Sequence, residues 1–314
     1  MSFTFTGVFP ILATPFNDDE SLDLASLERM IRFNFEAGVD GVTLLGLLGE
    51  SNRLTEAERS TLITTAIKAA GGRPVVVGTS HTGTAATIEL TKQATDLGAA
   101  AVMITPSQQP TPSDKAVFDY FDRIAGACPG VPIVLQDHPA ISNVHMPVEL
   151  ILRMVKEIPG IIGIKAEAVP SPAKIGALKK GLAELRHVSI MTGLGALYGL
   201  FDLERGSDGF NTGFAFPEVL LAILRAHRSG DRDAARRIYT RYLPLVVFEQ
   251  QPGLAIRKEI LRRRGLISSN RVRHPGATID AATASQLEEL LDWTFSGQDI
   301  RNVLVAHGAV APEA

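Results

Sequence analysis

The stretch GIIGIKAE, residues 160–167, carries two ionisable side chains at the end of an apolar run. Its isoleucines predict a short buried strand over Ile161–Lys165, because a nearly continuous apolar run of this length is typical of a strand covered on both faces. Side chains at positions i and i+2 of a strand point to the same face, so Lys165 and Glu167 are expected to project together. The pattern indicates either a reactive lysine with a neighbouring carboxylate or a surface ion pair just past the strand.

A lysine in such a position is suited to nucleophilic chemistry. Burial disfavours its charged ammonium form, and a neutral lysine amine forms a Schiff base with a carbonyl substrate. The organisation of the rest of the chain helps to choose between this interpretation and a surface ion pair.

Short β-rich runs alternate with helical patterns through most of the chain. The expected strands are Val8–Ala13, Gly41–Leu45, Pro74–Val77, Ala101–Ile104, Pro132–Leu135, Ile161–Lys165, Val188–Met191 and Asp208–Asn211. The expected helices are Leu24–Glu36, Glu56–Ala70, Thr84–Leu97, Asp114–Ala127, Pro147–Lys156, Pro172–Gly181, Leu194–Glu204 and Pro217–His227. This succession of β–α units has no break in composition, so it predicts a (β/α)8 TIM barrel rather than a doubly wound sheet.

The alternation stops near residue 229. Helical patterns then cover Asp231–Phe248, Leu254–Arg264 and Ala281–Trp293. We therefore expect a catalytic barrel domain over residues 1–229 and a C-terminal helical domain over residues 230–314. The basic run Arg262–Arg264 is expected to be a solvated helix end.

Composition excludes several classes of function. The chain of 314 residues has a net charge of −3 and is 45% hydrophobic and 21% charged, so neither a nucleic acid nor an anionic membrane is expected as a partner. Its single cysteine, Cys128, rules out an intrachain disulfide. No apolar run is long enough for a membrane span, and the first residues do not resemble a signal peptide. A cytoplasmic location is expected.

In barrels of this kind the active site lies at the C-terminal ends of the strands, which is where Lys165 falls. The loop after the second strand, Leu47-Leu48-Gly49, exposes backbone N–H groups beside a helix start and so offers a seat for a substrate carboxylate. Asn211 ends the eighth expected strand, Gln136 directly follows the fifth, and His81 lies in the loop after the third. These positions supply candidate site residues.

Four segments resemble the superfamily of class I Schiff-base lyases that contains dihydrodipicolinate synthase and N-acetylneuraminate lyase. They are Gly7 with 12–16 (LATPF), 46–51 (GLLGES) with Leu54-Thr55, 163–165 (GIK), and Gly206 with 209–212 (GFNT). The similarity runs from about Gly7 to His274. It implies a (β/α)8 barrel with a C-terminal helical domain, Lys165 as the Schiff-base former, no cofactor, and a homotetramer or dimer.

Departures from the synthase pattern exclude its activity. Leu47 and Leu48 replace two threonines of the family loop, Gln136 replaces a tyrosine, and Ile141 replaces an arginine. The proton relay of the synthase and its arginine for a second carboxylate are therefore absent. N-acetylneuraminate lyase is disfavoured for the same missing tyrosine, and the aromatic pair after the fourth strand is replaced by residues 107–108 (SQ).

The chain is more similar to members that act on 2-keto-3-deoxy sugar acids, particularly 2-keto-3-deoxy-L-arabonate dehydratase. The shared patterns are 79–81 (TSH), 136–139 (QDHP), 165–167 (KAE), and 265–268 (GLIS) followed by 273–275 (RHP). The resemblance implies a small-molecule 2-keto acid substrate. The loop over residues 47–49 differs from the corresponding loop of that enzyme, so the sugar acid stays open.

An imine at C2 of such a substrate acidifies the C3 protons, and expulsion of the C4 hydroxyl then completes a dehydration. Removing the proton of the C4 hydroxyl instead breaks the C3–C4 bond, which is an aldol cleavage. Glu167 is the candidate acid–base group, with a role as mere counter-ion of Lys165 as the alternative. Gln136 does not titrate near C4, which favours dehydration; it is expected to hydrogen-bond the substrate.

The remaining candidates each have a structural alternative. His81 is a candidate for substrate binding or proton transfer, with a loop hydrogen bond as the alternative. For residues 137–138 (DH) the alternative is a structural role. Glu50, near a helix start, is expected to complement the helix dipole. No metal site is expected, since no paired histidine spacing supports one. Function thus narrows to a dehydratase, an aldolase releasing pyruvate, or a sugar-acid-binding barrel without activity.

Overall fold

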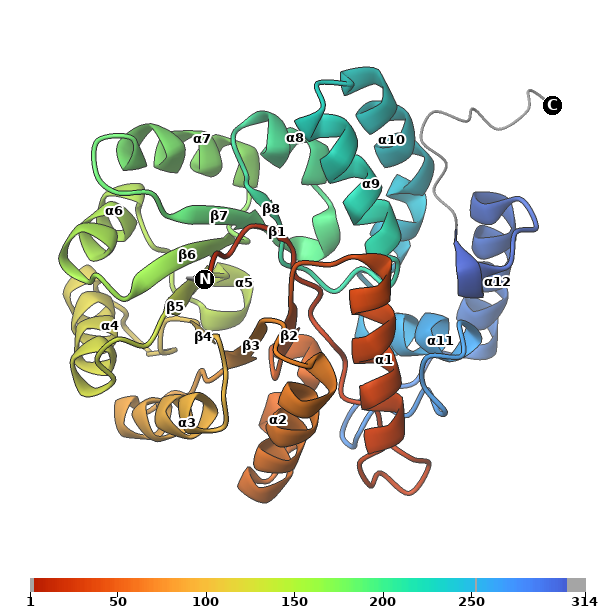
Figure 1. Cartoon of the computed structure of the whole chain (residues 1–314), viewed down its shortest axis with the longest axis horizontal. Helices are drawn as coiled ribbons and strands as arrows, with labels where there is room; N and C mark the ends of the chain where they lie inside the picture. The colour runs from red at the N-terminus through yellow and green to blue at the C-terminus, as the bar shows by residue number, and fades with distance from the viewer. Residues whose placement is uncertain (1–2, 252, 304–314) are drawn as a thin grey trace.

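The centre of the molecule is a sheet of eight parallel strands curled into a barrel (Figure 1). The computed structural model describes residues 3–251 and 253–303. The strands are β1 Gly7–Val8, β2 Val42–Leu44, β3 Val75–Gly78, β4 Ala101–Ile104, β5 Ile133–Asp137, β6 Ile161–Ala166, β7 Ser189–Thr192 and β8 Gly209–Phe210. β1 pairs with β8, and a parallel bridge between Ile11 and Thr43 joins the chain after β1 to β2. The fold is the predicted (β/α)8 TIM barrel.

Helices connect successive strands and cover the outside of the barrel (Figure 1). They are α1 Leu24–Ala37, α2 Glu56–Ala70, α3 Thr84–Asp96, α4 Asp114–Ala127, α5 Pro139–Ser142, α6 Val148–Glu157, α7 Ser171–Leu182, α8 Gly199–Glu204 and α9 Pro217–Arg228. Short 3-10 turns η1 Leu47–Gly49, η2 Ser51–Arg53 and η3 Leu194–Ala196 lie in the loops after β2 and β7. These loops occupy the end of the barrel where Lys165 emerges.

The core has two parts. One fills the inside of the barrel and includes Phe5, Phe9, Val76, Met103 and Met191, and the other lies between the strands and the surrounding helices. The ring of Phe5 also explains the glycine in the middle of β6. A Cβ atom at Gly163 would lie 2.6 Å from Phe5 Cδ1, closer than any carbon contact allows.

Two predicted elements differ in detail. The expected strand Val8–Ala13 is reduced to a short ladder and one bridge, since Pro10 has no N–H to donate to a continuous ladder. The expected helix Leu194–Glu204 is divided into η3 and α8, because Gly195 and Ala196 both have left-handed backbone angles (φ 65° and 66°). The short helix α5 was not predicted.

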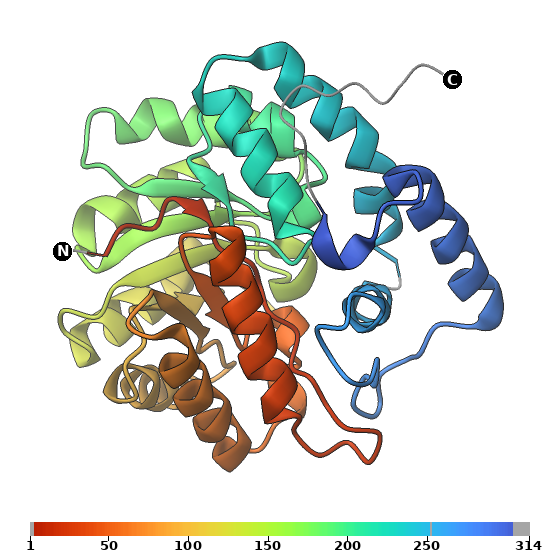
Figure 2. The same ribbon diagram turned by 45° about the vertical axis from the view of Figure 1, so that its right-hand side comes forward.

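Three helices follow the barrel, α10 Arg232–Phe248, α11 Leu254–Arg263 and α12 Ala281–Phe295, with a last turn η4 Ile300–Asn302. They lie along one side of the barrel (Figures 1 and 2). Phe295 of α12 stacks on Phe216 with ring centres 4.7 Å apart. The division into domains at residue 229 stays a prediction.

The basic run Arg262–Arg264, expected to be a solvated helix end, is solvated only in part, because Arg262 is exposed and Arg264 is not. Arg264 is buried, pairs with the carboxylate of Glu218, and donates to the carbonyl oxygens of Ala215 and Ile300. Arg262 and Arg263 pair with Glu259 on the same helix. Arg264 therefore anchors the end of α11 to the barrel.

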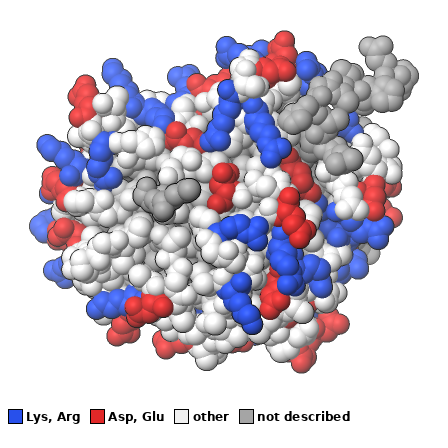
Figure 3. Space-filling view, in the orientation of Figure 1, with Lys and Arg blue, Asp and Glu red and all other residues white. Residues whose placement is uncertain are grey.

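The surface carries charges of both signs, intermingled over the face shown in Figure 3. Among the described residues, no helix combines the length and apolar character needed to cross a membrane.

Candidate active site

Lys165 lies in β6, one residue from its C-terminal end, with its side chain inside the barrel mouth. β5 and β6 are paired so that Gln136 stands opposite Lys165. Both side chains are only 5% exposed. The sequence prediction that Lys165 and Glu167 project to one face is confirmed, because Lys165 Nζ lies 3.2 Å from Glu167 Oε2.

Glu167 is held by two further donors. Gln136 Nε2 donates to Glu167 Oε2 at 2.7 Å, and the backbone N–H of Leu194 donates to Oε1 at 3.1 Å. The loop after β7 can approach this closely only with glycine at position 193, where a Cβ atom would lie 2.2 Å from Glu167 Cγ. Both carboxylate oxygens are thus fixed.

The surroundings favour an ionised Glu167. Burial acts to raise its pKa, but the charge of Lys165 and the hydrogen bonds from Gln136 and Leu194 lower the pKa below its usual value. His138 has its pKa lowered by burial and by the charge of Lys165, so its imidazole is neutral at pH 7. The site therefore contains a carboxylate and a neutral imidazole beside the lysine.

These groups line a cavity of about 450 Å³ at the C-terminal end of the barrel. Lys165, Glu167, Gln136 and His138 belong to the part formed by β5 and β6. The rest of the wall comes from other loops and from α11 and includes Leu47, Leu48, Leu194, Gln250 and Arg257. A volume of this size suits a small organic acid.

Of the other predicted site residues, some line this cavity and others lie away from it. Leu47 and Leu48 line the cavity, and Gly49 is next to them, with its carbonyl accepting from Thr14 Oγ1 at 2.6 Å. His81 lines a separate hollow, and its Nδ1 accepts a hydrogen bond from Gly83 N–H at 3.0 Å. Asn211 is fully buried, and its amide donates to Phe9 O and Thr43 Oγ1. Substrate roles for His81 and Asn211 stay predictions, and neither residue joins the Lys165 cluster.

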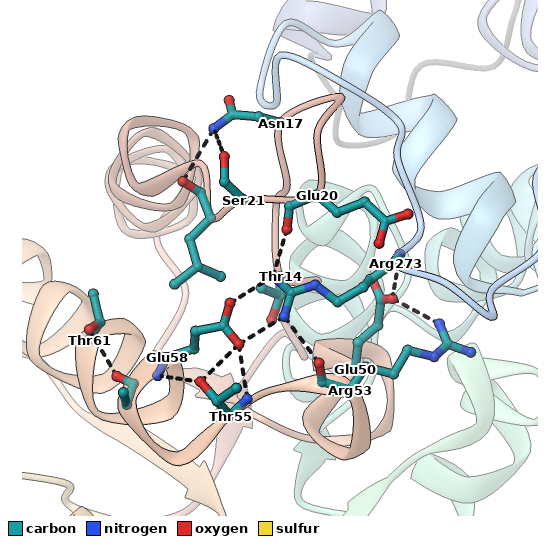
Figure 4. Close-up of polar contacts among 12 residues, drawn as sticks. Thr14, Asn17, Glu20, Ser21, Glu50, Arg53, Thr55, Glu58, Thr61 and Arg273 are labelled. Carbon is teal, nitrogen blue, oxygen red and sulfur yellow. Dashed lines mark hydrogen bonds and ion pairs between the residues drawn. The ribbon is translucent and has the colours of Figure 1, made fainter.

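Glu50 has a structural role that the helix-dipole interpretation missed. Its buried carboxylate lies 2.5 Å from Lys258 Nζ of α11 and accepts from Arg53 and from the backbone N–H of Arg273. Figure 4 shows this carboxylate beside Arg53, while the Arg273 side chain faces Glu58. These pairs connect the loop after β2 to the C-terminal helices.

Two other cavity residues were not singled out as functional by the sequence. His138 was considered structural, yet it lines the cavity, and Nδ1 of its ring is buried without a hydrogen-bond partner among the described residues. Arg257 comes from α11, in a helical pattern with no sign of an active site. Its position in space is the only signal for it.

Within residues 3–251 and 253–303, no group of three or more His, Cys, Asp or Glu side chains is arranged to hold a metal ion.

Several known proteins are similar to this chain in both sequence and fold. The model of the dihydrodipicolinate synthetase family matches residues 4–293. An L-2-keto-3-deoxyarabonate dehydratase from Azospirillum brasilense is 34% identical over 286 residues, covering 90% of this chain and 92% of that protein. A 4-hydroxy-tetrahydrodipicolinate synthase from Kosmotoga olearia is 30% identical over 247 residues, covering 77% and 82%.

Two solved structures bear on the site. A dihydrodipicolinate synthase from Rhodopseudomonas palustris superposes with a TM-score of 0.90 at 37% identity, covering 93% of this chain and 99% of that one. YagE from E. coli K12, a prophage protein of the dihydrodipicolinic acid synthase family in complex with pyruvate, has a TM-score of 0.85 at 28% identity, covering 92% and 98%.

Proposed function

The chain belongs to the dihydrodipicolinate synthetase family, and from this premise we propose that it is a Schiff-base dehydratase acting on a 2-keto-3-deoxy sugar acid. The observation that carries the proposal is the buried Lys165–Glu167 pair, with Gln136 where the synthase has a tyrosine. The named similarity to an L-2-keto-3-deoxyarabonate dehydratase supports the same substrate class.

Lys165 forms the imine. Lys165 attacks the C2 carbonyl as its free amine; the proton released by its ammonium form goes to the carbinolamine hydroxyl, which leaves as water, and a protonated imine remains at C2. The C1 carboxylate is expected to lie against the backbone N–H groups of Leu47 and Leu48, which border the cavity, since the N–H of Gly49 donates to Gly46 O. The pyruvate complex of YagE supports a 2-keto acid as the ligand of this cavity.

Glu167 moves the proton. As an ionised carboxylate fixed by three donors, it accepts a proton from C3, and the electron pair of that C–H bond is delocalised into the imine as an enamine. The protonated Glu167 then gives the proton to the C4 hydroxyl, which leaves as water. Hydrolysis of the conjugated imine restores the amine of Lys165 and releases an unsaturated 2-keto acid.

Aldol cleavage is the second candidate, and His138 is the observation that favours it. A neutral imidazole at the cavity wall is able to take the proton of a C4 hydroxyl, which breaks C3–C4 and releases pyruvate. Dehydration is preferred because the carboxylate of Glu167 is fixed 3.2 Å from the lysine amine and has a lowered pKa, and because Gln136 supplies no titrating group.

The experiment is borohydride reduction in the presence of a panel of 2-keto-3-deoxy acids, followed by peptide mapping and product analysis. The proposal expects an adduct on the peptide containing Lys165 and a dehydrated 2-keto acid, or the semialdehyde that it forms by tautomerisation. Lys165→Ala and Lys165→Arg should both lose turnover, because a guanidinium stays protonated. Pyruvate as product would establish the aldolase, and absence of any adduct would indicate a binding protein.

The proposal also covers the location of the protein, its oligomeric state and its domain organisation. We expect a cytoplasmic homo-oligomer, a tetramer or a dimer, without a cofactor, and we expect residues 1–229 to be the catalytic domain.

A further inference from the structure

Arg257 is a buried cation that reaches the cavity from outside the barrel. It lies on α11, is 7% exposed, and lines the cavity together with Lys165 and Glu167. Its Nε donates to Glu249 Oε2 at 3.1 Å, and Glu249 also accepts from the backbone N–H of Ala215. One edge of the guanidinium is therefore fixed by the protein.

The other edge is open. Among the described residues, Nη1 and Nη2 of Arg257 have no hydrogen-bond acceptor, whereas the terminal nitrogens of buried Arg264 bond Glu218 and Ala215. Gly195 lies beside this tip: a Cβ atom there would lie 2.1 Å from Gln250 Nε2 and 3.2 Å from Arg257 Nη2. An acceptor on a ligand in the cavity would complete the hydrogen bonding of these two donors.

The terminal nitrogens of Arg257 lie next to the loop that also holds Glu167. The loop after β7 holds Glu167 through the N–H of Leu194, and the next residue, Gly195, is the one beside Arg257. A substrate bound at Lys165 through C2, with C3 and C4 at Glu167, has its following carbons near this loop. Resting on the proposed function, we propose that Arg257 binds an oxygen on the substrate carbon beyond C4 and so selects 2-keto acids with a polar far end.

Two kinds of oxygen fit the Nη1 and Nη2 edge, a hydroxyl and a carboxylate. The binding of these two groups to Arg257 should depend differently on pH, because Glu249 shares the guanidinium. Burial raises the pKa of Glu249 to about 7 against the lowering effect of Arg257 and Arg264, the two cations that face it. An incoming carboxylate competes with ionised Glu249 for Arg257, so it should bind better at pH 6 than at pH 8. A hydroxyl has no such dependence.

The experiment compares three 2-keto acids that differ only at C5, namely a 2-keto-3-deoxypentonate, 4-hydroxy-2-oxoglutarate and 4-hydroxy-2-oxopentanoate. The readout is the concentration giving half-maximal borohydride trapping at Lys165, which needs no turnover. The wild type should favour an oxygenated C5 over the methyl compound by about 10- to 100-fold. The ratio between pH 6 and pH 8 identifies the hydroxyl or the carboxylate as the group bound.

Arg257→Met should abolish this preference while pyruvate, which has no far end, is trapped as in the wild type. Because that variant leaves Glu249 buried without its cation, the double variant Arg257→Met/Glu249→Gln is measured beside it. Arg262→Met is the matched control, since Arg262 is on the same helix and pairs with Glu259 away from the cavity. An unchanged preference in a variant that still traps pyruvate would overturn the role of Arg257. Failure of the wild type to trap pyruvate would overturn the proposed function instead.

Discussion

Lys165 Nζ and Glu167 Oε2 lie 3.2 Å apart at the end of β6, and both side chains are buried. The strand alternation brings them to one face, and Gln136 on the neighbouring strand adds a hydrogen bond to the same oxygen of Glu167. A carboxylate in this position is within reach of the carbon next to an imine at the lysine. The first two predictions below depend on this geometry.

Glu167→Gln should separate imine formation from dehydration. The amide keeps the size of the side chain but exchanges no proton, so borohydride trapping at Lys165 should persist while dehydration falls by roughly 10²-fold or more. Both quantities are measured on the same preparation. Near-wild-type dehydration would instead assign Glu167 as a counter-ion and move proton transfer to His138 or water.

Replacing Gln136 should shift the pH dependence of turnover. Its amide is one of the groups that lower the pKa of Glu167, so Gln136→Met should raise that pKa. The base must be ionised, and activity should therefore be lost at a higher pH on the acidic limb than in the wild type. A pH profile of kcat tests this, with Gln93→Met as the control, since Gln93 bonds Ser60 instead. An acidic limb that does not move would contradict the role of Gln136.

The Glu50–Lys258 pair should contribute to stability rather than to chemistry. Both groups are buried and 2.5 Å apart, and burial lowers the pKa of Lys258 to about 8 despite the opposing charge of Glu50. Lys258→Met should destabilise the fold by about 3 kcal/mol, because it leaves Glu50 with less compensation for its buried charge. Denaturant unfolding measures this. Adding Glu50→Gln should recover part of the loss, and equal destabilisation by the double variant would argue against coupling.

The protein should be a homo-oligomer in solution. The resemblance to tetrameric relatives motivates this, although Ser107 and Gln108 replace the aromatic pair that follows the fourth strand there, so a different contact is expected in that loop. Light scattering at micromolar concentration gives the mass directly. A monomeric mass would contradict the prediction.

Much of the fold followed from local pattern. Helices α2 and α4 and strand β4 begin and end at the predicted residues. The apolar pattern of each element, and the caps of the two helices, depend only on residues that are neighbours in the sequence. The divided helix after β7 was not foreseen. Leu194, Gly195 and Ala196 all have left-handed backbone angles there, and only the glycine is a residue type that favours them.

The sequence by itself determined the barrel, the strand that carries Lys165, and the shared direction of Lys165 and Glu167, since each depends on the spacing of residues that are close along the chain. Only the tertiary structure decided that Arg257 and His138 border the same cavity, that Glu50 pairs with Lys258, and that His81 and Asn211 lie elsewhere. The physical reason is that these relationships join strand ends and helices far apart in the chain. Their distances are set by barrel closure and by the packing of α11, and local periodicity carries no information about either.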